Sequence, residues 1–303
     1  MASPIEVILV PTLMILIGFI LKSKNILNQS DRQKLAGIVL NIALPSMIFI
    51  NLRTANISHD MLFLPILGFL TSSILIIISY AYCRIMHYDR KTMWTIIIAS
   101  SIMNTGFIGF PVCLGVYGNE GFLNALFFDL STTIMVVLYG IVLAKEFGKD
   151  HYDAIKGTLT FMPLWAMVFG LIFNYLNIPL PYVVENILNY FAQATIPLIM
   201  IALGLSLDFS NVKNYLTDSI VVSFFKLILA PAIIFLLLCA FKINGMAFNI
   251  GILEAAMSTA GNALVLAIAY DLKKDMMGSL IFVNVVLSVF TLTTIIFLLT
   301  MQS

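Results

Sequence analysis

Ten apolar segments, each long enough to cross a lipid bilayer as a helix, are the feature that most constrains this chain. A helix needs about 20 predominantly apolar residues to span the hydrocarbon core. Only 10% of the 303 residues are charged, against about 25% in soluble domains, and the connections between segments are short. The sequence therefore predicts an all-α integral membrane protein. The ten predicted transmembrane helices are residues 5–21, 35–52, 61–82, 93–117, 122–144, 158–175, 183–207, 220–241, 246–270 and 276–301.

Lysine and arginine residues are unevenly distributed among the loops between these segments. Thirteen of the 16 lie in odd-numbered loops, two lie in even-numbered loops, and Lys226 lies inside a predicted span. Basic loops favour the cytoplasmic side of a membrane. We therefore expect the odd loops to be cytoplasmic and both termini to lie outside. The expected location is the cell membrane, inner or plasma.

Prolines and glycines recur at a nearly constant spacing in the two halves of the chain. Three residues of the first half recur 152 positions later, with Pro11, Gly18 and Pro45 matching Pro163, Gly170 and Pro197. Five spans per half is an odd number, so the second half must enter the membrane from the opposite side. The sequence thus predicts two inverted five-helix repeats, residues 1–150 and 151–303.

The fourth segment contains a stretch, residues 104–111, that an ordinary membrane helix would not contain. Its sequence is N-T-G-F-I-G-F-P. Proline lacks a backbone donor and glycine loosens a helix, so backbone groups here are left without partners. Such groups are tolerated at membrane depth only where protein or a watery cavity surrounds them. The stretch therefore predicts the discontinuous helix of a secondary transporter. The alternative is a packing kink with a contact face of small residues.

The matching stretch of the ninth segment, residues 254–262, has small and polar residues but no proline. We therefore expect a milder break there. The half-helices beginning near Pro111 and Asn262 would both direct their N-termini at the membrane midplane. A helix N-terminus carries a partial positive charge and free N–H groups, which suit an anion. The pattern favours an anionic substrate.

Polar residues at the two breaks are the candidates for binding that substrate. Asn104 and Asn262 are the first candidates, with Thr105, Ser258 and Thr259 beside them. A neutral amide donates hydrogen bonds to a carboxylate without adding a fixed charge that would trap it. The alternative is that these side chains only join helices to one another, which polar residues in membranes commonly do.

Three ionisable residues, Asp129, Lys226 and Glu254, lie well inside predicted spans. Charge within a membrane is costly and indicates a functional site. Thr132 follows Asp129 by one helical turn, and clustered oxygens of this kind hold hard cations. We therefore expect Asp129, Thr132 and Glu254 to couple transport to an ion. The alternatives are a structural Asp129–Lys226 pair, and a Glu254 that lies in water at the outer end of its helix.

The chain contains no recognisable catalytic or metal-binding motif. It has neither an HExxH nor a GxSxG sequence, which metalloproteases and serine hydrolases carry. Its three cysteines have no CxxC spacing, and its three histidines fall in predicted loops. We expect no enzyme activity, no cofactor and no metal centre, with Na⁺ or H⁺ as the coupling ion. A nucleic-acid partner is not expected.

Two motifs resemble those of the auxin efflux carrier family, which includes plant PIN exporters and bacterial malonate and malate permeases. They are N-T-G-F-I-G-F-P at residues 104–111 and N-A-L-V-L-A at residues 262–267. The resemblance covers essentially the whole chain. It implies a scaffold, often dimeric, from spans 1, 2, 6 and 7. It also implies a moving transport domain from spans 3–5 and 8–10, with helices 4 and 9 crossed at the site. The family usually has a proline near Ser258, which this chain lacks.

A second, distant resemblance concerns the start of the ninth segment. Glu254-Ala-Ala-Met257 is similar to the E-x-x-M sequence of bile-acid sodium symporters, in which the glutamate helps to bind sodium. This similarity keeps sodium coupling open beside proton coupling.

The expected function is secondary active transport of small organic anions by alternating access. The substrates would be carboxylates such as malate, malonate or auxin-like acids. The alternatives are a sodium-coupled symporter of bile-acid-like amphipathic anions and a ligand sensor that does not transport. A channel is disfavoured because the sequence shows no continuous polar stripe.

Overall fold

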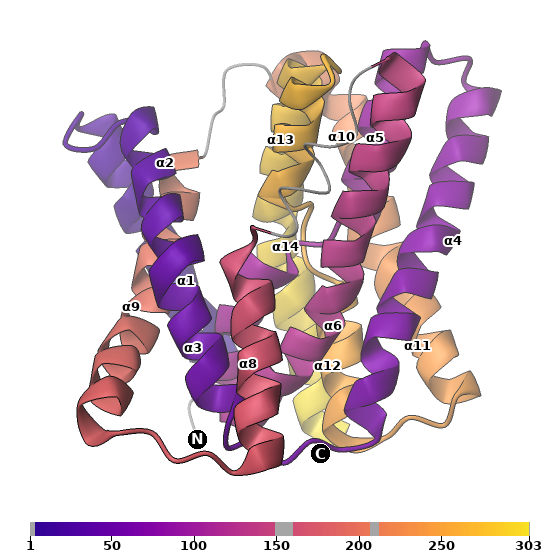
Figure 1. Ribbon diagram of the computed structural model, residues 1–303. Helices are drawn as coiled ribbons and strands as arrows, with labels where there is room; N and C mark the ends of the chain where they lie inside the picture. The colour runs from indigo at the N-terminus through magenta and orange to yellow at the C-terminus, as the bar shows by residue number, and fades with distance from the viewer. Residues whose placement is uncertain (1–3, 149–159, 207–211, 303) are drawn as a thin grey trace. The chain divides into compact units, whose positions relative to one another are not determined.

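The computed structural model describes residues 4–148, 160–206 and 212–302, and the regular elements in these ranges are helical (Figure 1). The described residues form six helical stretches that are long and apolar enough to cross a membrane. They are Ser30–Leu52, Asp60–Ile85, Thr105–Phe147, Tyr182–Ser206, Val212–Ala240 and Lys274–Met301. Three shorter apolar helices accompany them. The chain is therefore an all-helical, multi-pass membrane protein.

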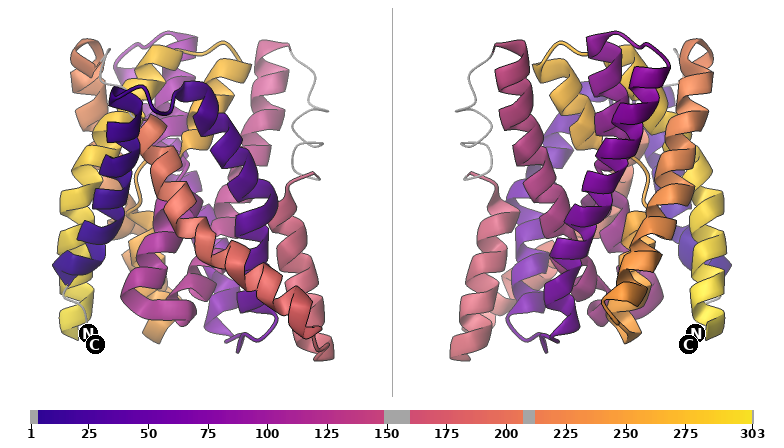
Figure 2. Two further views of the ribbon diagram at one scale, coloured as in Figure 1. Left: turned by 90° about the vertical axis from the view of Figure 1, so that its left-hand side faces the viewer. Right: turned by 90° about the vertical axis from the view of Figure 1, so that its right-hand side faces the viewer.

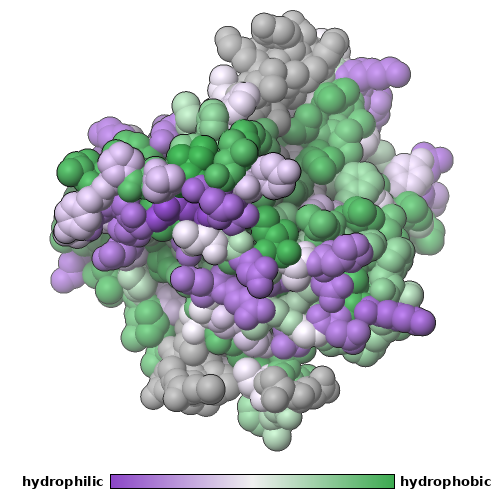
Figure 3. Space-filling model, turned by 60° about the horizontal axis from the view of Figure 1, so that its bottom comes forward, coloured by the Kyte–Doolittle hydropathy of each residue, from purple (hydrophilic) through white to green (hydrophobic). Residues whose placement is uncertain are grey.

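Many large hydrophobic side chains on these helices are exposed rather than packed in a core. Ile77, Ile85, Leu236 and Phe290, for example, are each at least 67% exposed. Figure 3 shows hydrophilic residues gathered on the face toward the viewer, with hydrophobic residues around them. Exposed apolar surface of this extent is the expected outer layer of a protein whose solvent is lipid.

The described chain forms two compact units, and the smaller comprises Leu9–Ile57 and Lys156–Leu207. Within it, α9 packs on α2 and α3, and α8 packs on α3 (Figure 2). A β-carbon on Gly204 would overlap the carbonyl oxygen of Ile15, so the backbones of α1 and α9 approach closely. The helices concerned are α1 (Pro4–Ser23), α2 (Gln29–Ile38), α3 (Leu44–Leu52), α8 (Met162–Leu176) and α9 (Tyr182–Ser206).

The larger unit comprises Met1–Ile8, Ser58–Ile155 and Asp208–Ser303. In it α4 packs on α5 and α6, α12 packs on α6 and α11, and α14 packs on α10 and α13 (Figures 1 and 2). Its helices are α4 (Leu64–Ile85), α5 (Arg90–Ser101), α6 (Phe110–Phe147), α10 (Leu216–Phe224), α11 (Ala230–Ala240), α12 (Gly245–Ala255), α13 (Gly261–Ala269) and α14 (Lys274–Gln302).

Three of the helical stretches contain a widened π-helical turn, and each turn ends two residues before a proline. The turns are η1 (Val39–Ala43), η3 (Thr105–Gly109) and η5 (Phe225–Leu229), and the prolines are Pro45, Pro111 and Pro231. Proline lacks the N–H that an α-helix needs at an interior position, and its ring crowds the preceding turn. A wider turn relieves this crowding, so the helix continues through the proline.

The fourth and fifth predicted segments are separated where the sequence placed the boundary between them. Residues 110–147 carry one label, α6, but they are two helices that meet at a kink at Gly118, where φ is 63° and ψ is −157°. This backbone conformation is almost restricted to glycine. The predicted loop between the two segments is thus a sharp local break at Gly118.

Candidate functional site

Two interruptions in the helices of the larger unit meet and pair with each other. One lies between α5 and η3, at residues 102–104, and the other lies between α12 and α13, at residues 256–260. The N–H of Asn104 donates to the carbonyl of Ser258 (2.9 Å), and the N–H of Ala260 donates to the carbonyl of Ile102 (3.2 Å). Met103 and Thr259 thereby form an antiparallel bridge. We call these paired segments the crossing.

The first half-helix begins at Thr105, and not near Pro111 as the sequence suggested. The carbonyl of Asn104 accepts hydrogen bonds from the N–H groups of Ile108 (3.2 Å) and Gly109 (3.1 Å). The π-helical turn η3 then runs directly into α6. Pro111 follows within the continuing helix, and the wider turn before it accommodates its ring and its missing N–H. The break therefore falls before the glycines rather than at the proline.

Neither half-helix has a side-chain cap at its N-terminus. Asn104 precedes η3, Ala260 precedes α13, and no side-chain capping bond is made at either position. The first N–H groups of a helix have no partner within the helix, so they are free to bind another acceptor. Because the crossing joins the two breaks, both N-termini begin within a few residues of the same backbone bridge.

The structure brings four of the five candidate substrate residues together, three within the crossing and Thr105 directly after it. Asn104, Thr105, Ser258 and Thr259 are each at most 3% exposed. The Thr259 hydroxyl donates to the carbonyl of Ala99 (2.6 Å), which anchors the second break to α5. The Ser258 hydroxyl has no hydrogen-bond partner among the described residues.

Asn262 differs from these four residues. It lies in the first turn of α13 and is exposed. Its repeat-related counterpart, Asn104, is buried within the crossing. The two amides thus have different surroundings, although they occupy corresponding positions in the two predicted repeats.

Glu254 lies in the last turn of α12, and its carboxylate rests against the backbone of η3. The residue is fully buried, which contradicts the alternative that placed it in water at the outer end of its helix. A β-carbon on Gly109 would overlap both carboxylate oxygens, so a larger residue there would displace the Glu254 carboxylate from its present position. The thiol of Cys113 donates to Oε1 (3.2 Å), and Oε2 has no partner among the described residues.

The carboxylate of Asp129 also contacts the first half-helix, at a different residue from Glu254. Asp129 lies in α6, and its Oδ1 accepts a hydrogen bond from the hydroxyl of Thr105 in η3. Thr132 is buried one turn further along α6. Both acidic residues therefore contact η3, Asp129 through Thr105 and Glu254 through Gly109.

Lys226 does not pair with Asp129, so the structural ion pair considered from the sequence is not formed. The ion pairs of the described residues are Lys34–Asp31, Arg53–Glu185, Arg90–Glu146 and Lys91–Asp271. The side chain of Lys226 is fully buried in the π-helical turn η5, and its Nζ has no hydrogen-bond partner in the described part of the chain.

Two residues of the site were missed in the sequence analysis. Gly109 and Cys113 both contact the Glu254 carboxylate. Gly109 belongs to the motif that was singled out, but its contact lies 145 residues away in the chain. The cysteine spacing bears only on metal binding, and it does not indicate that the Cys113 thiol is a hydrogen-bond donor.

Comparison with known proteins identifies the family. The model of the membrane transport protein family matches residues 5–160 and again 154–296. The chain is 35% identical to an uncharacterized transporter of Methanothermobacter thermautotrophicus over 289 residues, 95% of each chain. It is 33% identical to one of Methanocaldococcus jannaschii over 294 residues, 94% of this chain and 95% of the relative. A transporter of Escherichia coli is 23% identical over 282 residues, 87% of each chain. The chain therefore belongs to the membrane transport protein family, the auxin efflux carrier family that its motifs resemble.

Proposed function

We propose that this transporter is a secondary active carrier of small organic anions, chiefly carboxylates. The observation that carries the proposal is the pair of half-helix N-termini at the crossing, neither of which has a side-chain cap. Free N–H groups and the partial positive charge at a helix N-terminus attract an anion. The buried amide of Asn104, next to the first of these N-termini, adds hydrogen-bond donors without adding net charge.

The proposed topology has ten membrane-spanning helices in two inverted five-helix repeats. In the first repeat the spans are α1, α2–α3, α4, α5 with the start of α6, and the part of α6 after Gly118. In the second they are α8, α9, α10–α11, α12–α13 and α14. Both helix breaks fall in the fourth span of their repeats under this assignment, and this correspondence supports it.

In this proposal the two compact units have different roles during alternating access. The smaller unit contains α1–α3, α8 and α9 and acts as the scaffold, with the exception of the first residues of α1. The larger unit contains both breaks and acts as the moving transport domain. The grouping supports the proposal because every residue of the crossing, and both acidic residues, belong to one unit that can move as a body.

The proposed orientation puts both termini outside the cell, because thirteen of the 16 basic residues lie in odd-numbered loops. A cysteine introduced at Asn177, in the loop after α8, should react with a membrane-impermeant maleimide added to intact cells. A cysteine introduced at Arg90, at the start of α5, should react only after the cells are permeabilised. The opposite pattern would reverse the orientation.

The proposed coupling mechanism links the two carboxylates to the substrate site through η3. Asp129 bonds Thr105 at the start of this turn, and Glu254 lies against Gly109 at its end. When a proton or a sodium ion binds to these carboxylates, the charge next to the half-helix N-terminus changes. An ion and an anion that both contact one element influence each other's binding reciprocally. Either ion is compatible with this arrangement.

The substrate site is tested by truncating its amides. A counterflow assay with a panel of mono- and dicarboxylates in proteoliposomes would first identify a transported anion. Asn104→Ala and Asn262→Ala should each weaken binding of that anion, because a hydrogen bond to a charged group is lost. The expected cost of about 1.5–3 kcal/mol corresponds to roughly a 10- to 150-fold rise in Kd.

The control for this test is Asn51→Ala. Asn51 donates to the carbonyl of Met47 within its own helix and lies in the smaller unit, so its truncation should leave the Kd unchanged. If the Asn104→Ala and Asn262→Ala variants fold and bind the anion with wild-type affinity, these amides only join helices, and the proposed site is wrong.

Coupling is tested by uptake into proteoliposomes under an imposed sodium gradient and then a proton gradient. Asp129→Asn and Glu254→Gln should abolish gradient-driven uptake and retain downhill exchange, because each variant removes a carboxylate that changes its cation occupancy. Glu120→Gln, which alters an exposed carboxylate, should behave like the wild type. Equal uptake under every gradient in wild type and variants would instead make the protein a uniporter.

A further inference from the structure

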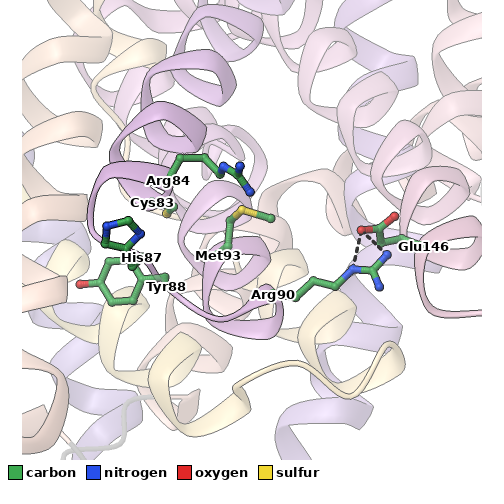
Figure 4. Close-up of a pocket in the computed structure, with 7 residues that line it drawn as sticks. All are labelled: Cys83, Arg84, His87, Tyr88, Arg90, Met93 and Glu146. Atoms are coloured by element: carbon green, nitrogen blue, oxygen red, sulfur yellow. Dashed lines mark hydrogen bonds and ion pairs between the residues drawn. The ribbon is translucent and has the colours of Figure 1, made fainter.

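We propose that a pocket at one end of the larger unit binds a phosphate group, carried by the headgroup of an anionic membrane lipid. The pocket lies where α4, α5 and α6 end or begin, and its volume is about 570 Å³ (Figure 4). Three basic side chains, one acidic side chain and two sulfur-containing side chains line it. They are Arg84, His87, Arg90, Glu146, Cys83 and Met93.

The backbone at the C-terminal end of α4 has a defined conformation, and it positions the pocket residues that this helix end contributes. His87 has a positive φ of 55°, its N–H donates to the carbonyl of Arg84 (3.4 Å), and the N–H of Tyr88 donates to the carbonyl of Cys83 (3.1 Å). This pair of bonds is a Schellman motif, which ends a helix sharply. The Tyr88 hydroxyl, also at the pocket, bonds Asp218 and so fixes the turn to α10.

One of the two arginines is already paired. Arg90 bonds Glu146 through Nη2 (2.6 Å) and Nε (2.7 Å), and its guanidinium lies 5.6 Å from the ring centre of Phe147. The carboxylate of Glu146 and the guanidinium of Arg90 therefore neutralise each other. Arg90 and Glu146 together form a neutral wall of the pocket.

Arg84 and His87, unlike Arg90, are not paired with an acidic residue. Neither side chain makes a hydrogen bond or an ion pair with the described residues, and both are exposed. Figure 4 shows the guanidinium of Arg84 extending across the pocket above Met93. The positive charge of the pocket is therefore available to a ligand, and a guanidinium fork matches the geometry of a phosphate.

The surface beside the pocket favours a lipid as the source of the phosphate. Ile77 and Tyr80 are 67% and 47% exposed, and they lie seven and four residues before Arg84, on one face of α4. Ile85, next to Arg84, is 74% exposed. Acyl chains would lie along this apolar face, with the phosphate at the arginine. Basic pockets between membrane helices on the cytoplasmic side bind lipid headgroups in this manner.

The proposal does not depend on transport. It uses the proposed orientation only to assign the pocket to the cytoplasmic leaflet, and its test is a binding measurement. A failure of the transport proposal would therefore leave it intact, and its own failure would leave the substrate site intact.

The test uses the full-length protein purified in a neutral detergent, with native mass spectrometry to count bound phosphatidylglycerol molecules against a phosphatidylcholine background. The wild type should retain one phosphatidylglycerol that Arg84→Gln releases, with a Kd at least 10-fold higher. Arg84→Lys should give an intermediate Kd because it keeps the charge and loses the fork. Lys24→Gln removes one exposed charge from another predicted cytoplasmic loop and should retain the lipid like the wild type.

A second arm separates the two sources of phosphate. Water-soluble glycerol phosphate is offered alone and in competition with phosphatidylglycerol, and it should bind far more weakly than the lipid. Equal lipid retention by wild type, Arg84→Gln and Lys24→Gln would overturn the proposal. Binding of glycerol phosphate as tight as that of the lipid, and lost in Arg84→Gln, would overturn the lipid assignment.

Discussion

Backbone polar groups cannot be left unpaired within a bilayer. In this structure the crossing pairs the backbone groups that two helix breaks would otherwise leave without partners. Two helical paths are broken in the larger unit, and the chain pairs the backbone groups of one break with those of the other, Asn104 with Ser258 and Ala260 with Ile102. The bonds fix the breaks in register. Two half-helices then begin beside the same bridge without side-chain caps. Everything proposed for anion binding follows from this one arrangement.

The small residues next to the crossing have a packing role, because the Glu254 side chain lies against them. Gly109 leaves room for the Glu254 carboxylate to lie on the backbone of η3, and the neighbouring Cys113 donates to it. Pro111 removes a donor, and the widened turn before it lets the helix continue. The Glu254 carboxylate thus contacts both the Cys113 thiol and the backbone of the first half-helix. In the proposed coupling mechanism, a change in the protonation or cation binding of Glu254 acts on the turn that leads to Asn104.

The sequence predicted the helical membrane fold and the family, because hydrophobic length and a specific motif are local signals. It also singled out both breaks, since N-T-G-F-I-G-F-P cannot form an ordinary helix in lipid. The position of the first break was wrong by several residues, because the sequence does not reveal that a π-helical turn accommodates Pro111. Contacts between distant residues were equally inaccessible. Nothing local indicated that Asp129 would bond Thr105 rather than Lys226, or that Asn262 would be exposed while Asn104 is buried.

The crossing itself can be tested by a disulfide between Met103→Cys and Thr259→Cys. The two residues face each other as a non-hydrogen-bonded antiparallel pair, since the bonds lie on either side of them. The α-carbons of such a pair are about 4.5 Å apart, within the range that a disulfide spans. Mild oxidation in native membranes, read by mass spectrometry of the linked peptides, should join the pair in most molecules. Met103→Cys with Val265→Cys, an exposed position further along α13, should not be joined. A yield no higher than in this control would contradict the account of how the two breaks are held together.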